Sequence, residues 1–352
     1  MGLMRNSTCL LQPSLASTVV LPIIYSFLFI TGSFGNILSY WIFSKHIATK
    51  RTQNIYLTNL VIANLLVCST MPFLAAYFAD GYQWAYESVL CKIVNYFGTL
   101  AMQTSMYISI TILCWTAVSQ YATLMKNNDY TQYSPSVNEN FFYKCLLDKF
   151  RQPKFAKYLC ISIWIIVLGV TIPVIMYDYH VEPNQEQVDR CYHWKSEYGG
   201  LTAKIPVLIA TAWFFLFFTT VLFSYYSLVN HLSKIQKNSC IGKKHLIYCT
   251  VKRNIFVIQL ILTVCFLPYH IFRPIFYALF ASEDCQRMNY LVETKNFLTC
   301  LAVAKSSTDP VVNLLLDKTF KKNLYNFFRK SSLQHHKHTA DIEETTQMCR
   351  NK

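Results

Sequence analysis

Long apolar stretches without a charged residue dominate the sequence. Six of them approach or exceed the roughly 20 residues that a helix needs to cross a bilayer. These stretches are residues 6–44, 52–79, 93–125, 158–177, 205–230 and 254–272. A seventh, from about residue 288 to 316, keeps its apolar positions but is interrupted by Lys295, Lys305 and Asp309. The pattern predicts an all-α membrane protein, a bundle of seven transmembrane helices.

The charges indicate how the bundle is oriented. With 53% hydrophobic and 14% charged residues, the composition excludes a soluble domain. Of the 32 Lys and Arg residues, 23 fall in four of the connecting or terminal segments: 45–51, 126–157, 234–253 and 317–352. Because such residues concentrate in cytoplasmic loops, the amino terminus is expected outside the plasma membrane. The net charge of +14 is then a consequence of topology, and no nucleic-acid partner is expected.

The ends of the chain differ in character from the bundle. We expect an extracellular segment at 1–17, a seven-helix domain at 18–316 and a polar, disordered cytoplasmic tail at 331–352. Residues 317–330 alternate cations with apolar residues at helical spacing, which is typical of an amphipathic helix on the cytoplasmic membrane surface. No cleavable signal peptide is apparent, and Asn6 begins an Asn-Ser-Thr glycosylation sequence.

The cysteines separate by compartment. Four of the 13 lie on the expected outer side, namely Cys9, Cys91, Cys191 and Cys285. An even number in an oxidising compartment predicts two disulfides, with three possible pairings. Neither the cysteine spacing nor the placement of histidines resembles a zinc site, and we expect no metal and no cofactor.

One stripe of the sixth span carries candidate chemistry. Phe266, His270 and Arg273 are spaced i, i+4 and i+7, so they share a helix face. Pro268 interrupts the same span and predicts a kink that a membrane bundle tolerates. Ionisable groups within a span are functional candidates. The alternative is that Arg273 only snorkels to the helix end and His270 makes a polar contact.

The order of several short motifs resembles that of rhodopsin-like G-protein-coupled receptors. The resemblance extends from Ser14 to Phe328, and each motif is weak alone but specific in combination. The motifs are Gly35-Asn36, Trp84 before Cys91, Trp164, Cys191, Cys265-Phe266-Leu267-Pro268 and Asp309-Pro310. The run Cys-Phe-Leu-Pro-Tyr-His followed by Arg273 is similar to the nucleotide-sensing purinergic branch of that family.

The resemblance implies disulfides and partners. It implies a Cys91–Cys191 bridge, and the branch implies a second bridge between Cys9 and Cys285. A receptor of this kind would act on a heterotrimeric G protein and arrestin at its cytoplasmic face, among membrane lipids. The basic loop 234–253 offers a docking face, although simple attraction to anionic lipid would also explain its charge.

The branch also implies where a ligand binds. His270, Arg273 and Lys295 match its anchoring positions, and Phe266 would lie beneath them. Convergent cations attract an anion through charge-assisted hydrogen bonds, so we expect a small anionic ligand. An internal salt bridge to Glu293, Glu283 or Asp284 is the alternative, and it would leave no site.

The expected activation switch departs from the family pattern. The acidic-arginine-aromatic triplet of the third helix is Ser119-Gln120-Tyr121, and Asn313 replaces a tyrosine at the end of the seventh. We assign the switch to these residues together with Pro268, Asp309 and Pro310. Cys91 and Gln120 are also about one helical turn further apart than usual. Two hypotheses follow: an ordinary agonist-driven receptor, or an atypical one with weak or constitutive coupling.

The polar core departs from the pattern as well. Its expected members are Asn36, Asn64, Ser109, Lys305, Ser306 and Asp309. Asn64 stands where the family has a sodium-binding Asp, and Lys305 where an Asn is usual. Since Lys305 and Asp309 are spaced i, i+4, they can pair. We hypothesise that the Lys305 ammonium takes the place of sodium; the alternative is that it snorkels into a wet interior.

Two other classes of protein fit less well. A transporter would show internal repeats or interrupted half-helices, and none is apparent. An enzyme would show a catalytic constellation within the membrane, but His270 has no evident nucleophile or metal partner. We therefore predict that the chain is a receptor and not an enzyme, with a transporter as the remaining alternative.

Overall fold

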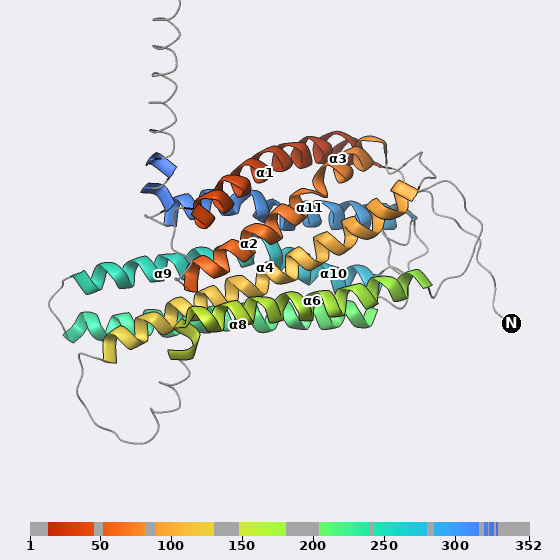
Figure 1. The fold of residues 1–352 in the computed structure, drawn as a ribbon. Coiled ribbons are helices and arrows are strands. Elements are labelled where there is room, and N and C mark those ends of the chain that lie inside the picture. The colour runs from red at the N-terminus through yellow and green to blue at the C-terminus, as the bar shows by residue number, and fades with distance from the viewer. Residues whose placement is uncertain are drawn as a thin grey trace, which may run out of the picture.

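The computed structural model describes residues 13–45, 52–81, 89–129, 148–180, 204–238, 243–279 and 285–316, and 320–322, 324–326 and 329 beyond them. Within these ranges the chain is helical and contains no strand. Figure 1 shows the long helices lying side by side along one direction. This arrangement is the helix bundle that the apolar stretches predict.

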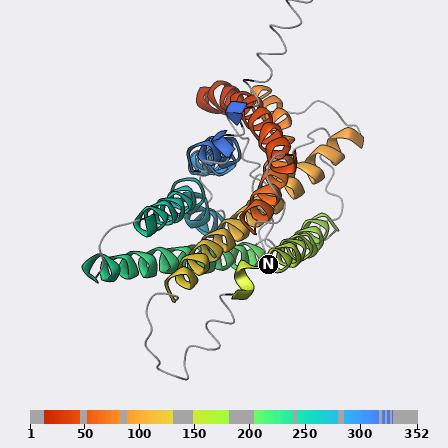
Figure 2. The ribbon, with the colours of Figure 1, turned by 60° about the vertical axis from the view of Figure 1, so that its left-hand side comes forward.

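The bundle is built around α4. The first two long helices are α1 (Leu21–Lys45), which continues a π-helical turn at Ala16–Val20, and α2 (Thr52–Cys68). They are followed by α4 (Val89–Asp129), α6 (Pro153–His180) and α8 (Lys204–Asn238). Figure 2 shows α4 crossing the bundle obliquely, and it packs against α2, α6, α8 and α9. Its central position explains why many α4 residues between Ala101 and Leu124 are buried.

The seventh helix, α11 (Cys285–Leu316), is the least apolar. Six of the helical segments described are long and apolar enough to cross a membrane, and α11 is not among them. It nevertheless packs against α1, α2 and α10 in the interior of the bundle. Lys305 and Asp309 are only 2% and 3% exposed, so the charges that lower its hydropathy are directed inward.

The second apolar stretch forms two helices. A turn at Ser69 and Thr70 separates α2 from α3 (Met71–Ala79). The Thr70 hydroxyl donates to the Val67 carbonyl at 2.7 Å, and Pro72 occupies the first turn of α3. Because proline has no N–H to donate, it suits the start of a helix better than its interior. The break therefore follows from local sequence.

The sixth span is interrupted just before Pro268. It consists of α9 (Lys243–Ile261), a π-helical turn η3 (Leu262–Phe266) and α10 (Leu267–Leu279). The Leu267 N–H donates to the Leu262 carbonyl, five residues back. The sequence predicts a kink at Pro268, whereas the irregular geometry lies in the preceding turn, whose hydrogen bonds the proline cannot complete.

Candidate functional site

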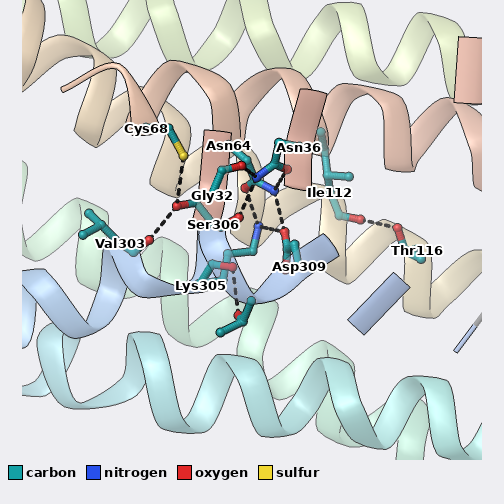
Figure 3. Close-up of polar contacts among 11 residues, drawn as sticks. Gly32, Asn36, Asn64, Cys68, Ile112, Thr116, Val303, Lys305, Ser306 and Asp309 are labelled. Carbon is teal, nitrogen blue, oxygen red and sulfur yellow. Dashed lines mark hydrogen bonds and ion pairs between the residues drawn. The ribbon is translucent and has the colours of Figure 1, made fainter. Parts of the chain in front are cut away.

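A buried ion pair lies at the centre of the bundle (Figure 3). The Lys305 Nζ is 2.6 Å from the Asp309 Oδ2, one turn apart on α11. Both side chains are almost completely buried. Such a pair is stable in a membrane interior only if its remaining hydrogen-bonding groups are also satisfied.

Asparagines from two other helices supply those partners. The Asn64 amide of α2 donates to the Asp309 Oδ2 at 2.8 Å and to the Asn36 Oδ1 at 3.0 Å. The Asn64 Oδ1 accepts from the Lys305 Nζ at 3.1 Å. The Asn36 amide in turn donates to the Gly32 and Ser306 carbonyls, each at 2.8 Å. The network joins α1, α2 and α11 through groups that complement one another.

The other two expected members of the polar core lie at its edge. The Ser306 hydroxyl donates to the Val303 carbonyl at 2.7 Å, so only the backbone of Ser306 joins the asparagine network. Ser109 of α4 is 3% exposed and lines a small cavity beside Lys305. The six residues therefore gather in one region, with the ammonium at its centre.

A second polar group surrounds Arg273 of α10. Its Nη1 donates to the Tyr107 hydroxyl at 2.7 Å, and its guanidinium carbon lies 5.7 Å from the centre of the Tyr269 ring. Within the part of the chain that the structure describes, no carboxylate lies within ion-pair distance of Arg273. The guanidinium is thus held in place by neutral aromatic groups.

The expected acidic partner on α11 is engaged elsewhere. The Glu293 Oε1 accepts from the Ser14 N–H at 3.0 Å and from the Ser17 hydroxyl at 3.1 Å. This carboxylate therefore anchors the start of the first helix. Glu283 and Asp284, the other candidate partners, lie outside the described residues.

The His270 ring is packed among aromatic side chains about one helical turn before Arg273. It is fully buried and stacks on Phe214, with ring centres 4.3 Å apart and planes at 6°. The Tyr269 ring meets it edge-on at 5.3 Å. Neither ring nitrogen has a hydrogen-bond partner among the described residues. Phe266, one turn below on η3, is 2% exposed.

Lys295 lies against α10 as well. Its Nζ is 5.4 Å from the centre of the Phe276 ring, about one turn beyond Arg273. The structure thus brings both expected cations to α10. Tyr107, which contacts Arg273, and Phe214, which contacts His270, are the two site residues that the sequence analysis missed. No local pattern in the sequence distinguishes them from other aromatic residues of the core.

The expected switch residues are only partly described. Ser119 is 7% exposed, Tyr121 packs against the hydrophobic core, and the Gln120 Oε1 is buried without a hydrogen-bond partner among the described residues. Pro310 lies within α11 and closely approaches Gly35 of α1. The Asn313 side chain lies outside the described set.

The disulfide and glycosylation predictions fall outside the described side chains. Cys9, Cys191 and Asn6 lie in segments that the structure does not describe. Cys91 and Cys285 are in α4 and α11, but their side chains are not described either. Both pairings and the glycosylation of Asn6 therefore stay predictions.

Known proteins are similar in sequence to this chain over most of its length. The family described as "7 transmembrane receptor (rhodopsin family)" matches residues 35–138 and 142–312. The chain is 53% identical to "Probable G-protein coupled receptor 82" from Homo sapiens, over 94% of this chain and 98% of that protein. The Mus musculus protein of the same name is 51% identical over 93% and 99%. "Probable G-protein coupled receptor 34" from Pan troglodytes is 28% identical over 90% and 77%.

Proposed function

The chain belongs to the rhodopsin family of seven-transmembrane receptors, multi-pass proteins of the plasma membrane, and on that basis we propose that it binds an extracellular anionic ligand and signals to a heterotrimeric G protein. Its relatives are named as receptors and not as enzymes.

The neutral surroundings of Arg273 support an anionic ligand. A fixed cation on a spanning helix is costly unless an anion accompanies it. Arg273 has only neutral contacts among the described residues, and Glu293 is occupied by Ser14 and Ser17. A ligand phosphate, carboxylate or acidic lipid headgroup would supply the missing charge through bidentate hydrogen bonds. Lys295 is proposed as its second contact.

A route from this site to the rest of the bundle follows from the packing below it. His270 and Phe266 lie on the same face, beneath Arg273 and next to the π-helical turn η3. A ligand that displaces the His270 and Phe214 stack would act on this turn and on Pro268. We propose that signalling proceeds through this movement of the sixth span.

Replacing Arg273 by glutamine tests the anionic ligand. The stimuli are a panel of phosphorylated and carboxylated compounds, each paired with an uncharged analogue, applied to cells that report G-protein dissociation. We expect Arg273→Gln to raise the half-maximal concentration of the active anion by about 10–100-fold, the cost of a charged hydrogen bond. Arg273→Lys should lose less, since it keeps the charge but not the planar fork.

Arg287→Gln is the matched control, because Arg287 is an exposed cation near the start of α11. It should leave the response unchanged. Equal potency of an anion and its neutral analogue, or an unchanged response in Arg273→Gln, would contradict the proposed ligand chemistry.

The cytoplasmic face is proposed as the docking surface. Phe320 is 2% exposed and meets Phe43 at 5.4 Å between ring centres, whereas Lys321 and Lys322 are exposed. This placement supports the amphipathic helix expected at 317–330. We propose that it and the basic segment 234–253 contact the G protein, arrestin and anionic lipid, with the amino terminus on the opposite, extracellular side.

Gln120 supports a second candidate, a receptor with atypical coupling. The neutral amide cannot make the ionic contacts of the arginine that the family pattern has there, and its buried oxygen is without a partner among the described residues. Losing such a contact shifts a two-state equilibrium by its differential free energy. We propose that basal activity is set at this position.

Restoring the arginine tests this candidate. We expect Gln120→Arg to change ligand-free G-protein activation by at least about threefold, which corresponds to roughly 0.7 kcal/mol between the two states. Gln152→Arg adds the same charge at an exposed position before α6 and should have no such effect. Equal basal signals from Gln120→Arg and the parent chain at matched surface expression would exclude Gln120 from the switch.

A further inference from the structure

The first turns of α6 carry exposed cations next to an exposed apolar face. Figure 2 shows α6 at the edge of the bundle, where it packs against α4 and α2. Lys154 and Lys157 are exposed, and the exposed fractions of Tyr158, Ile161 and Ile165 are 72%, 56% and 66%. Each lysine has one of these apolar side chains four residues further on, and residues so spaced share a helix face. This face therefore passes from cations at the membrane surface to apolar groups within the membrane.

The turn that leads into α6 is held in place by its own packing. The Phe150 ring meets Trp115 of α4 edge-on, with 5.3 Å between ring centres. The hydroxyl of Thr52, the first residue of α2, donates to the Arg151 carbonyl. Lys149 belongs to this turn and is exposed. A third cation is therefore fixed near the start of α6.

These three lysines make no ion pair within the described part of the chain. The nearest carboxylate in the sequence is that of Asp148, and its Oδ1 lies 3.7 Å from the Arg151 Nη1. That pair leaves the charges of Lys149, Lys154 and Lys157 without compensation among the described residues. Residues three apart on a helix have Cβ atoms roughly 5–6 Å apart, so the two lysines of α6 can contact the same anion.

We propose that this end of α6 binds a phospholipid whose headgroup carries more than one phosphate, in the leaflet that we propose to be cytoplasmic. A phosphomonoester carries about 1.5–2 negative charges at neutral pH, so such a headgroup can balance three lysines and a serine headgroup cannot. Tyr158 lies where tyrosines are common, at the boundary between headgroups and hydrocarbon. Ile161 and Ile165 continue along the acyl chains. A soluble phosphate compound would make no contact with this apolar face.

Native mass spectrometry of the full chain in detergent tests the proposal. The purified protein is mixed with phosphatidylinositol bisphosphate or with phosphatidylserine, and the ratio of the two dissociation constants is measured. We expect the wild type to prefer the bisphosphate by at least about tenfold. Lys154→Gln combined with Lys157→Gln should weaken bisphosphate binding by about 25-fold, roughly fivefold for each cation, and remove most of the preference. Arginine at both positions keeps the charges and should keep the preference.

Lys252→Gln combined with Arg253→Gln is the matched control, because it removes two charges from α9, where Arg253 is exposed and Lys252 is partly exposed. It should leave the preference for the bisphosphate unchanged, even where it weakens the binding of both lipids. An equal loss of preference in this control would show a diffuse attraction to basic charge and overturn the site. Equal binding of the two lipids by the wild type would also overturn it, as would a soluble inositol trisphosphate that binds as tightly as the lipid.

Discussion

Replacing Lys305 by methionine is expected to destabilise the folded receptor by about 3–5 kcal/mol, the usual cost of removing one partner of a buried ion pair. Methionine fills a similar volume but leaves the Asp309 carboxylate without its cation, although Asn64 still donates to it at 2.8 Å. The measurement is thermal unfolding of the purified chain in detergent, where the transition of Lys305→Met should fall well below that of the parent.

A double variant separates lost charge from lost packing. Asp309→Asn added to Lys305→Met removes the uncompensated carboxylate and keeps an oxygen for Asn64, so it should recover much of the loss. Lys157→Met, at an exposed position of α6, is the control and should change little. Equal unfolding temperatures for Lys305→Met and Lys157→Met would show that the pair contributes nothing.

The same proteins test whether the ammonium replaces sodium. If Lys305 takes the position of the ion, the parent chain should unfold at the same temperature in sodium and potassium buffers of equal ionic strength. Removing Lys305 frees Asp309 and the Asn64 oxygen, which are hard oxygen ligands of the kind that such cations prefer. A sodium-dependent transition in the parent would contradict the hypothesis.

Gly32 is expected to tolerate a larger side chain poorly. A Cβ at this position of α1 would lie 2.6 Å from the Ser307 Oγ and 2.8 Å from the Cys68 Sγ. Ser307 cannot easily move, because its hydroxyl donates to the Leu28 carbonyl at 2.8 Å. Gly32→Ala should therefore force α1 away from α11 and cost about 1–3 kcal/mol, as overpacking does elsewhere. Thermal unfolding and surface expression measure the loss.

Gly169→Ala is the matched control. A Cβ at this position of α6 meets nothing within 4 Å. The substitution should be neutral or slightly stabilising, since alanine favours a helix over glycine. Adding Ser307→Ala to Gly32→Ala removes the closest contact and should restore part of the stability. A Gly32→Ala protein as stable as Gly169→Ala would show that the helices adjust without cost.

The sequence by itself determined the class of protein. The apolar lengths predict six spans and a weaker seventh, and the comparisons confirm the rhodopsin-like family that the motifs resemble. Both are local properties: a bilayer requires a set number of apolar residues, and a motif occupies a few consecutive positions. The spacing of Lys305 and Asp309 also allowed their pairing to be expected, because residues one turn apart on a helix are within reach.

Only the tertiary structure decided which distant residues meet. Arg273 and Tyr107 are 166 positions apart, and Asn36 and Ser306 are 270 apart. No periodicity relates such positions, because they are brought together by the packing angles and rotations of separate helices. The same packing places the Glu293 carboxylate in hydrogen bonds with the start of the first helix and not beside Arg273. Because contacts between helices, and not any one helix, decide the partners of Glu293, the Arg273 guanidinium has no acidic partner among the described residues.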